Sequence, residues 1–418
     1  MQSGPWSRIA TIVVATSLLL TPAVIALADD GKPDEEDKKE SFVEALKGGK
    51  ATVNLRYRFE TVDQDNFDLK AYASTLRTTL SYGTRPYNGF RVVLQAENIA
   101  DIGAEDDHNN AGAGDRGNGI TDRPVVADPP GTEMLQAYVQ YQPGDSTLRL
   151  GRQEVILDDA RFVGNVGWRQ HHQSFRAFVF ANESVDRLRF IYSYIDRAYR
   201  ITGAQLDVDT HLLNANYRIG DIGAITAYGY LLRFDATPLQ RLDTNTLGVE
   251  FKGQSKVGAH GRVLYEAEYA SQSDSGNNPT NIDADYIHLM AGGGYRQLGV
   301  RIGWERLGGS EAEGQFQTVL ATLHAFNGWA DKFLSTPNNG LEDLYFRLDG
   351  RSGPLRWSVT YHDFRAATGD AEYGTELDFV INYRAPWAQT FGLKGALYTA
   401  EDFSVDTDKI WLYTGYAF

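Results

Sequence analysis

Two polar segments carry the side chains best suited to bind a charged or hydroxylated solute. The first follows Gly151-Arg152-Gln153, and the second begins near residue 308. Arginine can hold a carboxylate or a sugar hydroxyl through paired hydrogen bonds, and loops that fold into a barrel set its constriction. The alternative is two surface loops with internal ion pairs. The candidate solute-path residues in these segments are Arg152, Asp158, Arg161, Trp168, Arg169, Asp331 and Lys332.

Several histidines raise the question of catalysis. His171 and His172 precede Ser174, and His324 stands alone. A serine hydrolase also needs an orienting carboxylate, and the chain has no G-x-S-x-G motif. Residues 112–117 (GAGDRG) fit G-x-G-x-x-G, but prolines rather than a helix follow them. We therefore predict no catalytic residues, no cofactor and no enzyme activity.

The segment 100–131 is rich in carboxylates that could hold calcium or bridge to lipopolysaccharide through divalent ions. It contains Asp101, Glu105, Asp106, Asp107, Asp115, Asp122 and Asp128. Their spacing does not fit an EF-hand. We interpret this segment as a solvated acidic loop and predict no metal site.

Composition and the N-terminus restrict the class of protein. The net charge of −15 argues against nucleic-acid binding, and the absence of cysteine excludes disulfides and thiolate metal sites. Residues 1–28 are typical of a secretory signal peptide, with an apolar stretch that ends at the Ala26-Leu27-Ala28 cleavage site. Residues 29–50 are predicted to be an acidic periplasmic lead-in with a short helix, for which Ser41 and Glu44 could form a capping box.

From residue 51 to residue 418 the chain alternates apolar and polar residues, the pattern of strands with one apolar face. On many strands the polar positions carry arginine or glutamate. The strands of a soluble β-sandwich would rarely carry so many charged residues. Charge on the inside of a wide barrel explains this pattern more simply. Clear examples are residues 55–60, 90–97, 188–194 and 377–383.

The links between these strands alternate in length, as they do in membrane barrels with short periplasmic turns and long extracellular loops. Eight short links and nine longer ones join 18 strands and place both termini in the periplasm. Residues 315–325 look like a strand, but we assign them to one long loop (308–340), because a nineteenth strand would break the alternation. The short links are expected near 84–89, 143–145, 182–184, 220–222, 253–257, 296–298, 351–354 and 385–389.

The last strand, which alternates from Ile410 to the terminal Phe418, looks like the assembly signal of outer-membrane proteins. The sequence thus predicts an all-β fold, a transmembrane antiparallel β-barrel. Expected partners are outer-membrane lipid, lipopolysaccharide, a hydrophilic small-molecule or saccharide solute, and the barrel assembly machinery through the strand that ends in Phe418.

Three stretches resemble the alginate-export family of outer-membrane porins: residues 45–84, 150–175 and 325–346. The resemblance implies an 18-stranded barrel whose arginine-rich lumen selects a polyanionic uronate chain. In this chain the polar faces carry almost as many acids as bases, which weakens the case for alginate itself. The bases are Arg56, Arg58, Arg77, Arg91, Arg149, Arg187, Arg189, Arg262, Arg301, Arg347, Arg356 and Lys394, and the acids are Glu60, Glu97, Glu250, Glu266, Glu268, Glu305, Asp343, Asp349, Glu376 and Asp378.

The leading hypothesis is a channel of the bacterial outer membrane that passes hydrophilic solutes, including an anionic oligo- or polysaccharide such as alginate. The alternative is a barrel without transport activity, either an adhesion or structural protein or a lipase-like enzyme. The strand residues added to the predicted solute path are Arg56, Arg58, Arg77 and Arg347.

Overall fold

The structure is a computed structural model that describes residues 41–310, 312 and 314–418. The predicted signal peptide and residues 29–40 of the predicted lead-in lie outside the described residues. None of the helices in the described part of the chain is both long and apolar enough to cross a membrane.

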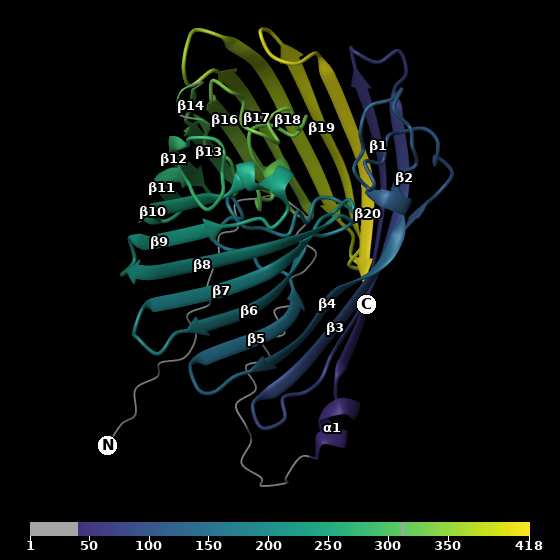
Figure 1. Cartoon of the computed structure of the whole chain (residues 1–418), viewed down its shortest axis with the longest axis vertical. Coiled ribbons are helices and arrows are strands. Elements are labelled where there is room, and N and C mark those ends of the chain that lie inside the picture. Colours follow the sequence, from purple (N-terminus) through teal and green to yellow (C-terminus); the bar gives the residue numbers. More distant parts are fainter. Residues whose placement is uncertain (1–40, 311, 313) are drawn as a thin grey trace.

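The chain forms one 18-stranded antiparallel sheet that closes into a barrel, as predicted (Figure 1). Each strand pairs with the next, β13 pairs with β16, and β20 closes the barrel on β1. The backbone of Phe418 exchanges hydrogen bonds of 2.8 and 3.0 Å with Val53 at this closure. The strands are β1 (Lys50–Gln64), β2 (Ala71–Gly83), β3 (Phe90–Asp101), β4 (Gly131–Tyr141), β5 (Ser146–Gln153), β6 (Ser174–Asn182), β7 (Leu188–Tyr199), β8 (Gln205–Ile219), β9 (Gly223–Leu232), β10 (Thr244–Val257), β11 (Gly261–Asp274), β12 (Asp283–Tyr295), β13 (Leu298–Leu307), β16 (Leu341–Ser352), β17 (Leu355–Arg365), β18 (Glu372–Arg384), β19 (Thr390–Ala400) and β20 (Thr407–Ala417).

The remaining elements are small. The helix α1 (Phe42–Lys47) precedes the barrel, and Ser41 and Glu44 cap it reciprocally. The segment 315–325 is part of a loop and not a barrel strand. It contributes the end of a two-residue hairpin, β14 (Gly309–Ser310) with β15 (Gly314–Gln315), and the 3-10 turn η3 (Leu323–Ala325). The other 3-10 turns are η1 (Gly114–Arg116) and η2 (Thr237–Leu242).

Four outer loops are named by their order along the chain: the second (102–130), third (154–173), seventh (308–340) and ninth (401–406). One predicted turn is misplaced, because residues 253–257 belong to β10 and the turn is 258–260. Gly258 adopts φ +61°, which suits a tight turn. Gly253 instead lies inside the strand, where a Cβ would meet the ring of Tyr265 at 2.5 Å.

The alternating pattern separates a lipid-facing surface from the lumen. In β3, Leu94 is 43% exposed on the outer face, whereas Glu97 is 1% exposed on the inner face. The largest buried cluster of apolar side chains is in the lumen, where Trp168 of the third loop and Phe316 of the seventh loop are both part of it. The loops therefore form the hydrophobic core inside the ring of strands.

Replacement of Leu94 by arginine is expected to lower the free energy of unfolding by about 2–4 kcal/mol if the position is near the bilayer midplane, because the charge would face lipid. Arginine at the neighbouring Gln95, which faces the lumen and bonds Gln136, should cost far less. Reversible urea unfolding in lipid vesicles measures both. Equal losses at the two positions would contradict the assigned faces.

Candidate functional site

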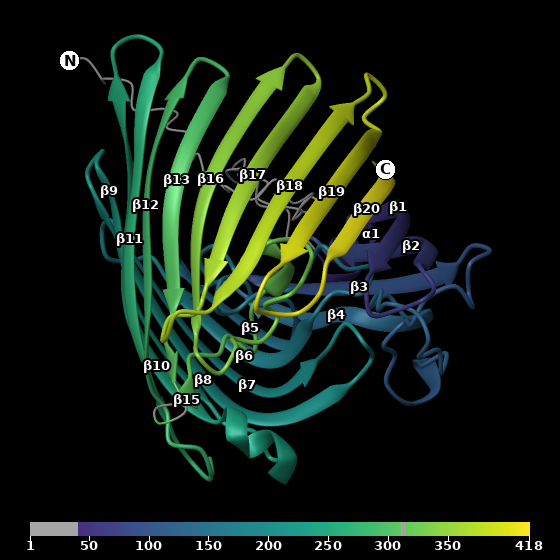
Figure 2. The same cartoon turned by 90° about the horizontal axis from the view of Figure 1, so that it is seen from above.

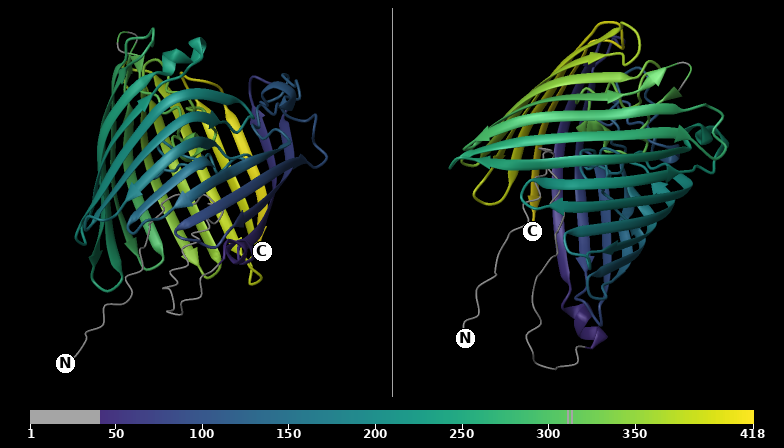
Figure 3. Two further views of the ribbon diagram at one scale, coloured as in Figure 1. Left: turned by 60° about the horizontal axis from the view of Figure 1, so that its bottom comes forward. Right: turned by 90° about the vertical axis from the view of Figure 1, so that its left-hand side faces the viewer.

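The third and seventh loops fold into the barrel and pair with each other (Figure 2). The amide of Gly164 donates to the carbonyl of Leu320 at 2.9 Å, and the amide of Thr322 donates to the carbonyl of Ala160 at 3.0 Å. The third loop also contacts β1 on one side and β13 on another. Loop segments accordingly cross the space that the strands enclose (Figure 3). The two loops together are called the plug.

Three predicted solute-path arginines, Arg56, Arg58 and Arg77, are buried against the plug, with exposures of 5, 1 and 2%. Arg56 donates to the carbonyls of residues 167, 168 and 169 at 3.1, 2.7 and 2.6 Å, and to Gln170 Oε1 at 3.0 Å. Arg58 donates to the carbonyl of Trp168 at 2.6 Å. These guanidinium groups therefore hold the backbone of the third loop.

The second loop reinforces this contact through Asp128, which is fully buried. One carboxylate oxygen pairs with Arg58, and the other accepts from the amide of Gln170 at 2.7 Å. The predicted solvated acidic loop thus places one of its acids inside the barrel, where an arginine neutralises it. Sequence spacing gave no sign of this pairing.

Trp168 lies at the centre of the plug and is 3% exposed. Its ring stacks on His324 at 5.3 Å with an interplanar angle of 7°. The ammonium group of Lys394 lies 4.1 Å from the ring centre of Trp168 and 3.6 Å from that of Trp329, and its Nζ is 2.6 Å from His324 Nε2. Lys394 of β19 therefore contacts both loops of the plug.

Asp331 of the seventh loop connects the plug to the barrel wall at β20. Its Oδ2 accepts from Arg169 and from Lys409 of β20, each at 2.8 Å, and its Oδ1 lies 2.6 Å from His324 Nδ1. Burial by itself raises the pKa of Asp331, but its contacts with His324, Lys409 and Arg169 outweigh burial and hold that pKa well below its usual range. Asp331 is thus an ionised junction between the third loop, the seventh loop and β20.

Arg161 makes a second junction between the loops and the wall. It is 3% exposed and donates to Glu305 of β13 at 2.6 Å and to Asn327 of the seventh loop at 3.1 Å. Asn327 in turn donates to Asp343 of β16 at 3.2 Å. The charge of Arg161 is compensated by Glu305 and is not presented to a passing solute.

The other predicted loop residues lie farther from this centre. Arg152 donates to Glu133 at 3.1 Å and stacks 3.7 Å above the ring of Tyr199. Asp158 accepts from Asn214 of β8 at 2.7 Å. Lys332 is half-buried, with its ammonium group 5.5 Å from the ring centre of Tyr398.

Arg347 lines a cavity of about 150 Å³ between the seventh loop and the wall from β10 to β18. Arg301, its partner across β13 and β16, donates to Asp349 at 2.5 Å, and Arg347 Nε lies 3.9 Å from the same carboxylate. In the described part of the chain, the buried Nε atoms of Arg301 and Arg347 have no hydrogen-bond partner. The cavity lining also includes Lys252, Tyr286, Phe326, Asn327, Trp329, Tyr345, Thr360, the histidines His288 and His362, and the carboxylates Asp159, Glu266, Glu305, Asp343 and Asp378.

Several bases of the lumen lie close to the periplasmic turns. Arg91, Arg262 and Arg356 are each the second residue of a strand that starts at a periplasmic turn, and Arg301 is the fourth. Glu97, by contrast, is the eighth residue of β3. The distance of each charge from the nearest predicted turn is the signal in the sequence that separates a basic periplasmic zone from a mixed central one.

The histidines that raised the question of catalysis lie within hydrogen-bond distance of carboxylates. His172 Nδ1 lies 2.8 Å from Glu154, while Ser174 accepts from Arg152 at 2.8 Å. Glu97, Glu133 and His171 place ligand atoms within 4.8 Å of one another and could hold a metal ion. Because Arg152 already pairs with Glu133, this cluster has a protein counter-ion.

Comparison with known proteins identifies the family. The sequence model described as "Alginate export" matches residues 50–305. No curated protein matches the chain. Similar solved structures include OpdK of Pseudomonas aeruginosa with vanillate (TM-score 0.70, 15% identity, 89% of this chain and 99% of that chain). OccAB2 of Acinetobacter baumannii has a TM-score of 0.70 at 15% identity, covering 90% and 99%, and OccD3 (OpdP) of P. aeruginosa has 0.68 at 17%, covering 90% and 92%.

At these identities the solved structures establish the fold, and the family match covers more than half of the chain. The similar structures agree with the closed barrel described above. The chain belongs to the alginate-export family and is a porin of the bacterial outer membrane.

Proposed function

We propose that this channel passes anionic, hydroxyl-rich solutes of the class of short uronate oligosaccharides, and that they enter from the periplasmic side. The observation that carries the proposal is the zone of bases next to the periplasmic turns. Arg262 and Arg356 have no ion-pair partner among the described residues, so their charge is available to a solute. A cleft lined by one sign of charge concentrates ions of the opposite sign.

The next bases inward, Arg301 and Arg347, share the single carboxylate of Asp349. Two guanidinium groups beside one carboxylate leave a net positive charge. The Nε atoms of both arginines also lack a hydrogen-bond acceptor among the described residues. A carboxylate of a solute would supply acceptors of the kind that arginine binds most strongly. These two arginines extend the basic zone from the periplasmic rim to the cavity beside the plug.

The cavity lining also suits a sugar unit. Trp329, Tyr286 and Tyr345 supply aromatic surface, while Thr360 and Asn327 supply polar groups. The volume of this cavity, about 150 Å³, is about half that of the smallest pockets that bind drug-sized ligands. An oligosaccharide would therefore pass through it one sugar unit at a time.

The charge of the outer side supports entry from the periplasm. The ninth loop carries Glu401, Asp402 and Asp406, and the second loop carries most of the acids of the segment 100–131. An anion that approaches from outside meets these acids first, whereas an anion that enters the lumen from the periplasm reaches Arg91, Arg262 and Arg356 at the second residue of their strands.

Neutralising Arg262 and Arg347 together by glutamine is expected to reduce the anion-to-cation permeability ratio several-fold, most at low salt, because screening is weakest there. This pair leaves the contact between Arg301 and Asp349 intact. The reversal potential in a planar bilayer under a salt gradient measures the ratio. Arg365→Gln, at the outer end of β17 and paired with Asp363, is the control and should leave the ratio unchanged.

The solute class is tested by block of the ion current. A uronate trisaccharide on the periplasmic side should block the channel at a lower concentration than a neutral trisaccharide of equal length. The double variant should lose that difference. Equal block by both sugars in the unaltered channel would refute the proposal.

A further inference from the structure

The helix α1 presents an apolar face that the barrel does not cover. Phe42, Val43 and Leu46 are 57, 53 and 37% exposed, whereas Ala45 on the other side is 2% exposed. These three residues project over a little more than a quarter of the helix circumference, given 3.6 residues per turn. A short helix with such a face is amphipathic and needs an apolar environment on that side.

The helix is fixed in position against the barrel. The hydroxyl of Tyr82 donates to the carbonyl of Leu46, and the amide of Arg85 donates to the carbonyl of Ala45 at 3.1 Å. The rings of Phe42 and Tyr87 meet edge to face at 6.1 Å. The exposed face is therefore held in one orientation beside the periplasmic ends of β2 and β3 (Figure 1).

Aromatic side chains mark the level of the membrane interface at this end of the barrel. Phe90, the first residue of β3, stacks on Tyr141, the last residue of β4, at 4.4 Å, and they are 50 and 37% exposed. Tyr295 and Phe418 are also exposed at or near the periplasmic ends of their strands. Rings of this kind lie where the hydrocarbon meets the headgroups. Because α1 is attached through Tyr82 and Tyr87, it lies at that level.

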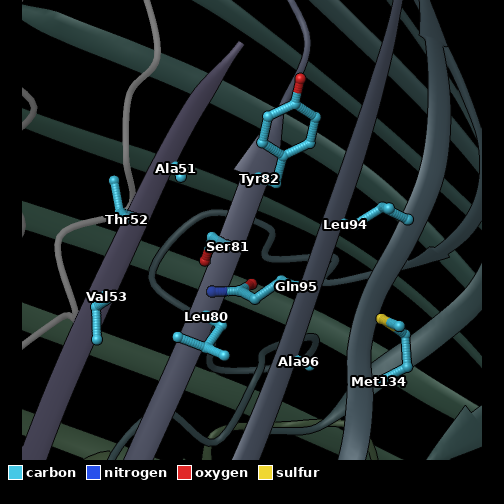
Figure 4. A pocket seen from close by; sticks show the side chains of 10 residues that line it. All are labelled: Ala51, Thr52, Val53, Leu80, Ser81, Tyr82, Leu94, Gln95, Ala96 and Met134. Atoms are coloured by element: carbon cyan, nitrogen blue, oxygen red, sulfur yellow. The ribbon is translucent and has the colours of Figure 1, made fainter. Parts of the chain in front are cut away.

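A pocket of about 310 Å³ lies on the outer wall near α1. Figure 4 shows its residues on β1, β2, β3 and β4, with Ala51 beside Tyr82 and Ala96 beside Met134. Tyr82, which holds α1, also lines this pocket. The pocket and the helix therefore meet at Tyr82.

Bases surround this surface on the periplasmic side. Lys47 ends α1, Lys50 starts β1, and the side chain of Arg85 lies across Gly48. Cations at the level of the headgroups attract anionic lipid, by roughly 1 kcal/mol per residue close to the surface. Glu44, the acid of the helix, is directed into its capping box.

We propose that α1 and the adjoining pocket form a binding surface for an anionic phospholipid of the periplasmic leaflet. Phe42, Val43 and Leu46 insert at the hydrocarbon boundary, one acyl chain occupies the pocket, and the bases of α1 and β1 contact the phosphate. This surface lies outside the lumen and is independent of the transported solute.

Spin labelling tests the insertion directly, because the chain has no cysteine. A label at Val43→Cys is compared with a lipid-facing reference, Leu80→Cys (54% exposed), and a water-facing reference, Asp186→Cys in a periplasmic turn. In vesicles of phosphatidylethanolamine and phosphatidylglycerol, the label at Val43 should collide with oxygen about as often as that at Leu80 and be shielded from a water-soluble nickel complex. Accessibility equal to that at Asp186 would overturn the proposal.

Two further measurements distinguish a lipid from a protein partner and test the contribution of charge. A label at Val43 that is water-accessible in these vesicles but shielded in native membrane fragments would overturn the lipid assignment and indicate a protein partner. Replacing phosphatidylglycerol by phosphatidylcholine, or introducing Lys47→Gln with Lys50→Gln, should make the label shallower. An unchanged depth of the label in both cases would overturn the proposal that the bound lipid has an anionic headgroup.

Discussion

Asp331→Asn is expected to convert a narrow, stable conductance into a larger and fluctuating one. The substitution removes the carboxylate that accepts from both Arg169 and Lys409 at 2.8 Å, and it weakens the contact to His324. Arg169 keeps longer contacts with Glu60 and Asp128, at 3.3 and 3.8 Å. Loss of one partner of a buried ion pair costs about 3–5 kcal/mol. A loss of 3 kcal/mol from the closed arrangement of the loops changes its population relative to open arrangements by roughly 100-fold.

Single-channel recording of the purified protein measures this effect. Asp363→Asn is the matched control, because Asp363 pairs with Arg365 at 2.8 Å at the exposed outer end of β17. That control should conduct as the unaltered channel does. Thermal unfolding of the barrel should remain cooperative in both variants, since strand pairing does not involve either carboxylate. An Asp331→Asn channel with unaltered conductance and noise would show that this junction does not hold the plug.

The closed barrel and its strand number could be predicted because both depend on local patterns. A period of two residues identifies a strand with one apolar face, and the alternation of short and long links fixes how many strands there are. The prediction that residues 315–325 lie in a loop is correct for the same reason. The misplaced turn at 253–257 arose because Gly253 looks like a turn residue, whereas it packs beneath Tyr265.

The pairing inside the lumen could not be predicted, because it joins residues far apart in the chain. Arg161 meets Glu305 across 144 residues, and Arg169 meets Asp331 across 162. The sequence showed arginines in a loop but not their partners, so they were expected to face the solute. In the structure both are compensated, whereas the buried Nε atoms of Arg77, Arg91, Arg301 and Arg347 have no hydrogen-bond partner among the described residues.

The arginines of the lumen therefore have different roles. Arg56 and Arg58 fix the third loop, Arg161 and Arg169 join the two loops, and Arg301 and Arg347 remain for a solute. A solute larger than the cavity of about 150 Å³ would require residues 325–329 to move away from the wall. In the proposed function, the stability of the plug sets the size of the solute and the wall sets its charge.

Deletion of residues 158–169 is expected to raise the single-channel conductance several-fold and to weaken ion selectivity. The deletion removes Arg161, Trp168 and Arg169, so the seventh loop loses these contacts with the third and keeps the hydrogen bond from Gln173 to the carbonyl of Leu320 at 3.0 Å. The barrel should still close, because the remaining residues 154–157 and 170–173 can join β5 and β6, just as residues 200–204 alone join β7 and β8.

The change in selectivity follows from the charges that lose their partners. Arg56 loses the carbonyls of residues 167–169 and Glu305 loses Arg161, whereas Arg58 keeps its pair with Asp128. The deleted segment carries two acids and two bases, and the uncovered Arg56 and Glu305 have opposite charges, so the wider pore should be less selective. Adding Arg56→Gln to the deletion should shift the reversal potential toward cations, most at low salt, while the conductance stays high. A strongly anion-selective deletion channel would contradict this charge balance, and an unchanged conductance would mean that the third loop does not obstruct the pore.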